Sequence, residues 1–369
     1  MDYILPESDG LRIEYFGHLF DNISECYKMF WFQVIVEKIL AGQTSASYEE
    51  IIDEMITHAW YMVAEYHLNL GPRDNLEFVV NRLVEISGFK ASEDKAVLLE
   101  YIRNCQDPEV LRYKKILTTN VPYRLQAPFL DWKTDDWNVG KRQLIDRINA
   151  YYRLIYKFDQ LDGLNTRIHF DEKWSEYIVR NQVIIKGWLK YNLVEYLQRR
   201  NPNVPGVIDK LYPPQEQKLE DIQKYWKLIM TVQPVVEIYG NGELTEKDIS
   251  IDHFVPWSYV ANDEIWNLHP TTKNINSSKS NHLPRWDVYF KKLSGLEYLS
   301  YQLMWRHDGI RKEFEKIKKK HLNSPLVEGR LYAPNLSGEE FCGRLSEIVL
   351  PVYQSAKAAG FREWEYTAD

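Results

Sequence analysis

Residues 249–284 read ISIDHFVPWSYVANDEIWNLHPTTKNINSSKSNHLP, and this stretch decides the fold of the later part of the chain. Its first residues alternate between apolar and polar side chains, which predicts a strand. An apolar run at 235–239, followed by a Gly-Asn-Gly turn, predicts a second strand. We therefore expect 235–239 and 249–254 to pair as a hairpin, with a short helix at 271–280 packed on it.

The strand expected at 249–254 contains Asp252-His253 near its end, which places a hard oxygen ligand beside an imidazole. Hydrolysis of a phosphodiester needs an activated water, a neutralised phosphate charge and a stabilised leaving oxygen. Neighbouring side chains on a strand point to opposite faces, so a local twist must bring these two to one site. An Asn or His from the short helix can complete the protein ligands. A site with few protein ligands and open water positions favours Mg²⁺ or Mn²⁺ over zinc.

This stretch resembles the ββα-metal core of HNH endonucleases. It is especially similar to the version in RNA-guided CRISPR effectors and in stand-alone bacterial HNH proteins, and the resemblance covers residues 235–284. The residues that keep the family's order and spacing are Asp252, His253, Pro256, Ser258, Asn267, Asn276, Lys279, Ser280 and Pro284. Many matched positions in one short segment make a specific signal, whereas a lone Asp-His pair would carry none.

The resemblance implies a role for each polar residue of the motif. It makes Asp252 the first metal ligand and His253 the general base that deprotonates the attacking water, a role that suits neutral imidazole. Asn267, the middle residue, fixes the His253 ring through backbone contacts. Asn276 is the second metal ligand; Asn274 competes for that position, although the spacing favours Asn276.

Basic residues near the motif are candidates for contact with the substrate. We expect Lys279, Lys273 and Arg285 to bind the phosphate, although Lys279 fits a solvated helix end equally well. His269 and His282 are nearby but lie outside the motif, and histidines so placed are more often surface residues than catalytic ones.

Many stand-alone relatives bind a structural zinc through a Cys-x-x-Cys knuckle on the first strand. The corresponding stretch here, 237–240, reads EIYG and holds no cysteine. The chain's cysteines, Cys26, Cys105 and Cys342, are too far apart to form a zinc cluster or a disulfide framework. We therefore predict no structural zinc and a hairpin that is held by packing alone.

Charge is distributed unevenly along the chain. The net charge of −7 argues against a nucleic-acid partner, because phosphate binding normally needs a basic surface. However, residues 1–60 carry 11 acidic and 3 basic side chains, whereas residues 271–330 carry 13 basic and 6 acidic ones. This asymmetry is typical of a nuclease with a separate acidic partner-binding or regulatory lobe. A solvated lysine-rich helix at 311–320 accounts for part of it.

The remainder of the chain is predicted to be mostly helical. Ser47 and Glu50 form a capping-box pattern at the start of one apolar stripe. Helices are expected at 27–40, 51–63, 76–86, 96–102, 141–158, 174–200, 216–230, 286–305, 310–320 and 339–359. Thr166 begins a short strand that continues to residue 170. Residues 118–140 lose the periodicity and are interpreted as a connector with short strands.

These patterns predict a mainly α protein with a small α+β insertion. The expected parts are a helical N-terminal lobe (1–120), a helical middle lobe and connector (121–232), the HNH core (233–285) and a helical C-terminal extension (286–369). A signal peptide is not expected, since acidic residues replace the basic start, and the apolar runs are too short to span a membrane. We therefore expect a cytoplasmic protein with no membrane partner.

Three functional hypotheses follow. The first is a Mg²⁺-dependent DNA endonuclease, with His as general base, in a prokaryotic anti-phage defence or restriction system. The second is a nucleic-acid-binding subunit of a larger defence complex, whose HNH core acts only when a partner protein activates it. The third is that the acidic helical lobe is a docking surface for a partner such as an ATPase or sensor. RNA stays open as a substrate, because the motif contacts phosphate and sugar more than bases.

Overall fold

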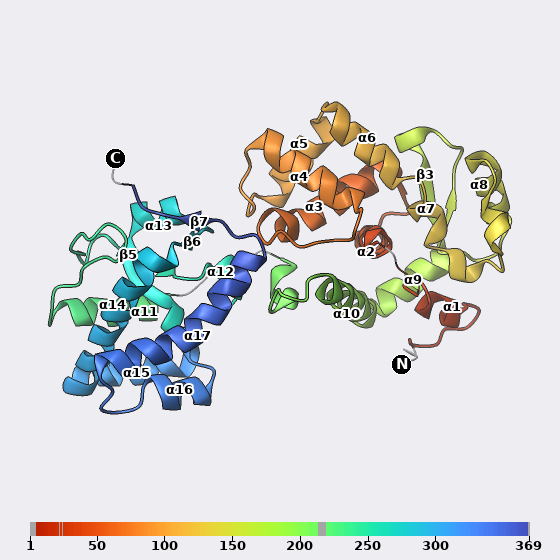
Figure 1. Cartoon of the computed structure of the whole chain (residues 1–369). Helices are drawn as coiled ribbons and strands as arrows, with labels where there is room; N and C mark the ends of the chain where they lie inside the picture. Colours follow the sequence, from red (N-terminus) through yellow and green to blue (C-terminus); the bar gives the residue numbers. More distant parts are fainter. Residues whose placement is uncertain (1–4, 22, 24, 213–218, 368–369) are drawn as a thin grey trace. The chain divides into compact units, whose positions relative to one another are not determined.

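The computed structural model describes residues 5–21, 23, 25–212 and 219–367, and the chain forms two compact units (Figure 1). The first unit comprises Met1–Pro202 with Leu211–Pro213, and the second comprises Asn203–Lys210 with Pro214–Asp369. The mainly helical fold class with a small ββα region is confirmed. The expected N-terminal lobe and most of the expected middle lobe lie in the first unit, and the expected HNH core and C-terminal helices lie in the second.

The first unit is built from helices and a small antiparallel sheet. Its helices are α1 (Ile13–Gly17), α2 (Tyr27–Leu40), α3 (Tyr48–Ala64), α4 (Asn75–Ser87), α5 (Lys95–Asn104), α6 (Pro108–Leu117), α7 (Val121–Arg124), α8 (Lys141–Asn149), α9 (Glu172–Arg180) and α10 (Gln182–Arg200). Short 3-10 turns are η1 (Ala127–Phe129), η2 (Thr134–Trp137) and η3 (Gly163–Asn165). The strands β1 (Ser45–Ser47), β2 (Tyr156–Phe158) and β3 (Arg167–Phe170) pair in the order β1-β3-β2.

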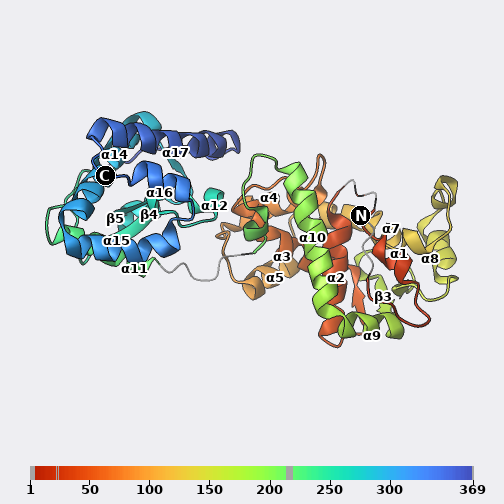
Figure 2. The ribbon, with the colours of Figure 1, turned by 90° about the horizontal axis from the view of Figure 1, so that it is seen from below.

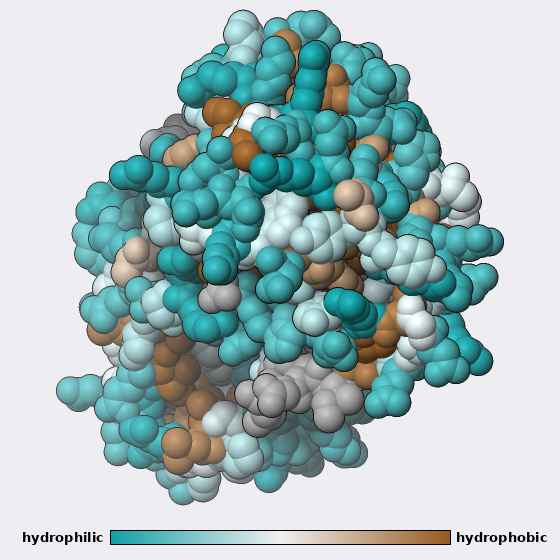
Figure 3. Space-filling view, turned by 90° about the vertical axis from the view of Figure 1, so that its right-hand side faces the viewer, coloured by the Kyte–Doolittle hydropathy of each residue, from teal (hydrophilic) through white to brown (hydrophobic). Residues whose placement is uncertain are grey.

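Aromatic packing fills the core of this unit. Helix α2 is buried along most of its length, because its sequence is apolar on every side. Phe16 stacks on Trp174 with ring centroids 5.1 Å apart, and Phe20 stacks on Trp188 at 4.7 Å. The predicted capping box forms at the start of α3, where the Ser47 and Glu50 side chains bond to each other's backbone N–H. The face seen in Figure 3 is mainly hydrophilic, with apolar side chains gathered in patches.

The structure corrects three of the predicted elements in this unit. Residues 118–140 form helical turns and not strands, because Pro122 and Pro128 lie at the starts of α7 and η1, where proline favours a helical turn. A single helix was predicted at 141–158, but α8 ends at Asn149, and the last three residues of the predicted range form β2. The helix predicted at 174–200 is interrupted at Asn181, which separates α9 from α10.

The N-cap of α4 is a buried carboxyl group with a raised pKa. Asp74 accepts hydrogen bonds from the backbone N–H groups of Leu76 and Glu77 at 2.8 and 3.0 Å. Burial nevertheless raises the pKa of Asp74 to about 7. The folded protein therefore keeps a proton that the unfolded chain releases near pH 4, so the stability of this unit falls as the pH rises from about 4 to about 7. The slope is at most about 1.4 kcal/mol per pH unit.

Substitution of Asp74→Asn is expected to remove this pH dependence, because Asn caps a helix as well as Asp and has no proton to bind. The free energy of unfolding of Asp74→Asn should exceed that of the unmodified chain by an amount that increases from about pH 4 to about pH 7. Above pH 7 this difference should stay constant. Urea unfolding across this range measures it. Asp94→Asn, at the exposed N-cap of α5, is the matched control. A gain in Asp74→Asn that is the same at every pH would contradict the prediction.

The second unit places a two-stranded hairpin among helices. Its elements are η4 (Val207–Lys210), α11 (Glu220–Met230), β4 (Ile249–His253), α12 (Trp257–Val260), η5 (Ile265–Asn267), β5 (Leu268–Thr272), α13 (Lys273–Lys279), β6 (Leu283–Pro284), α14 (Trp286–Arg306), α15 (Asp308–His321), α16 (Pro325–Leu331), α17 (Gly338–Ala358) and β7 (Glu363–Trp364). Figure 2 shows β4 and β5 with α11, α14 and α15 around them.

The hairpin differs from the predicted one in its second strand. Strand β4 pairs antiparallel with β5, so that Asp252 lies opposite His269. Residues 235–239 make only an isolated bridge, Val236 to Glu243, to the turn that follows them. Strand β5 could not be predicted from the sequence pattern. It is buried on both faces and contains Pro270, so it lacks the alternation that identifies a half-buried strand.

The C-terminal helices and the last strand complete the core of this unit. Phe254, which directly follows β4, packs against Trp286, Phe290 and Tyr353 of α14 and α17. Strand β7 pairs in parallel with β6, which follows α13. The hairpin and α13 are thus enclosed by a shared apolar core and held in a fixed arrangement. In the described part of the chain, every helix is too short or too polar to cross a lipid bilayer.

Candidate active site

Asp252 lies near the end of β4 and is buried, with 5% of its surface exposed. Its Oδ1 accepts a hydrogen bond from Lys279 Nζ at 3.0 Å, and its Oδ2 accepts one from the Tyr239 hydroxyl at 2.9 Å. His269 Nε2 lies 3.6 Å from the same Oδ2. Buried carboxylates need such partners, so these contacts keep the charge of Asp252 inside the protein.

His253 ends β4 and is also buried, with its ring directed at a carboxylate. Its Nε2 lies 2.8 Å from Asp263 Oδ1. Because an ionised carboxylate can only accept a hydrogen bond, Nε2 is the donor in this contact and Nδ1 takes no part in it. The loop that holds Asp263 is anchored to the end of α15, where His321 Nδ1 lies 3.0 Å from the Asp263 carbonyl oxygen.

Asn267 is fully buried at the end of η5. Its Oδ1 accepts a hydrogen bond from the Val255 N–H at 2.7 Å, and its Nδ2 donates to the Val255 carbonyl at 2.8 Å. The side chain therefore fixes the backbone two residues beyond His253. The sequence predicted backbone contacts for Asn267, and in the structure they are made to Val255.

Asn276 lies on α13, on the side of the helix that packs on β4. Its Nδ2 donates to Ser250 Oγ at 3.0 Å and to the Ile251 carbonyl at 3.1 Å. Both of these bonds use the amide nitrogen, and the carbonyl oxygen of the side chain is an electron-pair donor that a hard cation can use. Asn274 is exposed.

Lys279 lies one helical turn after Asn276 and is fully buried. Its ammonium donates to Asp252 Oδ1 and, at 2.8 Å, to the His253 carbonyl, so it links both motif residues. The group faces Asp252 and not the protein surface. The expected contact of Lys279 with a substrate phosphate stays a prediction, and in this arrangement the ammonium is already occupied.

The other two residues that were predicted to contact phosphate differ in whether their charged groups are already paired. Lys273 is exposed at the start of α13. Arg285 is half-buried, and its guanidinium forms ion pairs with Asp287 at 2.6 Å and with Glu365 at 2.7 Å. An incoming phosphate would therefore have to compete with two carboxylates for Arg285, whereas Lys273 has an accessible ammonium.

His269 was expected at the surface, and the structure corrects this. It is fully buried in β5, opposite Asp252, between the rings of Tyr239 and Phe254. Burial lowers the pKa of His269 to about 4, so the ring is neutral at physiological pH. Neither ring nitrogen has a hydrogen-bond partner among the described residues. The prediction failed because His269 belongs to the strand that the sequence pattern did not reveal.

Glu237 organises the loop in which many relatives carry a cysteine knuckle. Its carboxylate accepts hydrogen bonds from the backbone N–H groups of Tyr239, at 2.9 Å, and Gly240, and from the Thr271 hydroxyl at 2.9 Å. Burial raises the pKa of Glu237, and these donors oppose the rise. The loop is thus tied to β5 by hydrogen bonds as well as by packing. The expected lack of structural zinc stays a prediction.

A second group of metal-binding residue types lies in the first unit. Glu37 and Glu54 approach His58 between α2 and α3. Lys38 Nζ lies 2.6 Å from Glu54, and His58 Nε2 lies 2.8 Å from Glu37. The carboxylates are therefore already paired with protein groups, and we assign no function to this cluster.

Comparison with known proteins identifies the segment that contains the candidate site. Residues 237–285 match the model of a family described as HNH endonuclease. The match includes the Glu237 loop, the β4–β5 hairpin and α13, so this segment is an HNH endonuclease domain, as the sequence motif predicted. No curated protein and no solved structure was found to match the chain.

Proposed function

We propose that this chain is a metal-dependent endonuclease that hydrolyses DNA phosphodiester bonds in prokaryotic anti-phage defence or restriction. An HNH endonuclease domain implies a nuclease that binds nucleic acid and depends on a metal. The observation that carries the finer proposal is the side-chain arrangement on β4 and α13. Asp252 and His253 end β4, Asn267 clamps the backbone that follows, and Asn276 and Lys279 face the same strand.

In this proposal His253 is the general base. The Asp263 carboxylate holds the Nε2–H, which leaves Nδ1 to accept the proton of the attacking water. The fixed ring orientation lowers the entropic cost of reaching the reactive geometry. Asn267 supports this arrangement indirectly, because it prevents the backbone at Val255 from shifting. It is a positioning residue.

Asp252 and Asn276 are the proposed metal ligands. A carboxylate and an amide carbonyl are hard oxygen donors, and two such ligands leave positions for water and phosphate, which suits Mg²⁺, with Mn²⁺ as a substitute. The bound ion would neutralise the phosphate charge and stabilise the leaving oxygen. Lys279 keeps Asp252 in place through its bond to Oδ1 and supplies positive charge beside it.

The nucleic acid is proposed to contact the basic residues that follow the hairpin. Exposed Lys273 is the best placed of these, and Arg285 can contribute if it exchanges Asp287 or Glu365 for phosphate. Residues 271–330 carry the excess of basic side chains. Several lysines of α15 already form ion pairs, for example Lys318 with Glu328 at 2.8 Å, so the field is weaker than the composition suggests.

An assay of substrate form tests the proposal. The purified full chain is incubated with supercoiled plasmid, linear duplex, single-stranded DNA and RNA, with Mg²⁺, with Mn²⁺ and with EDTA. The proposal expects metal-dependent cleavage of at least one DNA form. Cleavage of RNA alone would contradict the DNA assignment and leave the nuclease assignment intact.

Burial of the motif favours a second candidate function, a core that acts only after a partner protein activates it. Asp252 and His253 have 5% and 6% of their surface exposed, which leaves little room for a phosphodiester without a local rearrangement. In that case the purified chain would bind DNA but not cut it. Cleavage that appears only in a complex isolated from the native host would support this candidate, and cleavage by the chain alone would exclude it.

Substitution of Asp263→Asn is expected to lower kcat by about 10- to 100-fold, because Asp263 orients the base through a hydrogen bond and does not touch the substrate. KM should stay nearly constant. Asp263→Glu, which keeps the charge, should restore part of the activity. Asp248→Asn, at an exposed position in the loop before β4, is the matched control. A rise in KM with unchanged kcat would assign Asp263 to substrate binding instead.

A further inference from the structure

A large cavity in the first unit has no role in the proposed cleavage. Its volume is about 790 Å³, and it lies among the segment that leads into α2, the start of α4 and the turn between α6 and α7. This volume is within the range of small-molecule sites in proteins. All the residues that line it belong to the first unit, so the cavity does not depend on the HNH domain.

Two cations line this cavity without a direct ion pair among the described residues. Lys28 and Arg124 line it, and among the described residues neither forms an ion pair within 4.0 Å or a side-chain hydrogen bond. Burial lowers the pKa of both groups, and the charge of Arg124 lowers that of Lys28 further, whereas Asp21 raises it. Half-buried Lys28 and exposed Arg124 repel each other, and a bound anion would offset that repulsion.

The acidic groups of the wall do not supply this anion. Asp21 is paired with His18, with 2.6 Å between Oδ2 and Nδ1. Burial raises the pKa of Glu25, and the charge of Arg200 lowers it. Among the described residues, neither carboxylate forms an ion pair with Lys28 or Arg124 within 4.0 Å.

Arg124 is also held in a fixed position. Its guanidinium carbon lies 3.9 Å from the centre of the Trp137 ring, which is a close cation–π contact. The side chain therefore loses less conformational freedom when it binds a ligand, and its planar donors suit the oxygens of a phosphate.

The rest of the lining is divided between hydrogen-bonding and apolar groups. Asn75 and Asn120 contribute amide side chains, and Ile116, Leu117 and Val121 contribute apolar walls. Inorganic phosphate would use only the two cations. A ligand with an anionic end, a polar ring edge and an apolar body would use all three kinds of group.

We propose that this cavity binds an organic phosphate of nucleotide size, with the phosphate on Lys28 and Arg124 and the organic part among Asn75, Asn120 and the apolar wall. Such a ligand would bind the first unit independently of the nuclease reaction. A cavity of this volume accommodates a free nucleotide.

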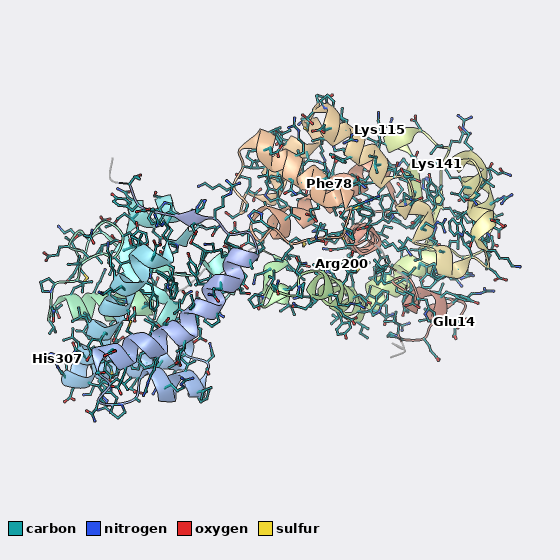
Figure 4. The ribbon with its side chains drawn as sticks, viewed as in Figure 1. Glu14, Phe78, Lys115, Lys141, Arg200 and His307 are labelled. Atoms are coloured by element: carbon teal, nitrogen blue, oxygen red, sulfur yellow. The ribbon has the colours of Figure 1, made fainter. Side chains whose placement is uncertain are left out.

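Calorimetric titration of the full chain with ATP, AMP and pyrophosphate in EDTA tests the proposal. At least one nucleotide should bind saturably and more tightly than pyrophosphate. Lys28→Gln and Arg124→Gln should each weaken that binding by at least tenfold. The matched control is Lys115→Gln on α6, an exposed lysine next to Ile116 but outside the cavity lining, and its affinity should equal that of the unmodified chain (Figure 4). Circular dichroism verifies that each variant is folded.

Three results would overturn the proposal. The first is no saturable binding of either nucleotide at millimolar concentration. The second is pyrophosphate binding as tight as that of the nucleotides, which would remove the organic part. The third is a nucleic-acid surface in place of a nucleotide site. Lys115→Gln would then lose as much affinity as Lys28→Gln and Arg124→Gln, or a DNA oligonucleotide would displace the nucleotide with an affinity equal to that of the nucleotide itself. None of these depends on cleavage, so failure here leaves the proposed nuclease function untouched.

Discussion

Replacing His253 with alanine is expected to lower the rate of DNA cleavage by about 10²- to 10⁴-fold, the loss that follows removal of a general acid or base. The reason is that Asp263 holds the His253 ring through Nε2, which leaves Nδ1 as the proposed acceptor of the proton of the attacking water. The rate of plasmid nicking under single-turnover conditions measures the change. Binding of DNA to the variant should be within a few-fold of the unmodified chain.

His307→Ala is the matched control for this experiment. His307 lies in the same unit, between α14 and α15, and is exposed, so loss of its imidazole should leave cleavage unchanged (Figure 4). Equal activity of His253→Ala and the unmodified chain would contradict the assignment of the base. Equal losses in both histidine variants would indicate a general effect on the unit.

The second large effect is expected at Asp252, where Asp252→Ala should abolish metal-dependent cleavage and also destabilise the fold. The substitution removes a proposed metal ligand and leaves the buried Lys279 ammonium without its carboxylate. Breaking a buried ion pair from one side costs about 3–5 kcal/mol. Urea unfolding in EDTA measures the loss of stability without interference from bound metal.

A double variant separates the two consequences. Asp252→Asn with Lys279→Met removes both charges, keeps side chains of similar size and should recover most of the stability. Cleavage should remain absent, because the carboxylate ligand is still missing. If cleavage returned together with stability, the role of Asp252 would be structural and the metal site would have to be sought elsewhere.

Features that depend on neighbours in the sequence could be predicted. The bounds of α2 and the capping box at Ser47 agree with the pattern, because both depend on contacts within one or two helical turns. The HNH segment was recognised for a similar reason, since its motif occupies one continuous stretch. The short helix expected there corresponds to α13.

Features that depend on distant partners could not be predicted. Strand β5 is buried on both faces, so its sequence lacks the alternation of a half-buried strand, and burial of His269 was missed with it. The contact between Asp263 and His253 bridges a loop whose shape depends on the end of α15. Lys279 looked like a helix-end lysine, and only the packing of α13 on β4 shows that its ammonium faces Asp252.

The most direct test of the proposed function is cleavage of supercoiled plasmid by the unmodified full chain as Mg²⁺ is added and then removed with EDTA. We predict that nicked circles accumulate only after the metal is added and that accumulation stops when EDTA is present. Plasmid that stays supercoiled in Mg²⁺ and in Mn²⁺, or nicking that continues at the same rate in EDTA, would contradict the proposed metal-dependent cleavage.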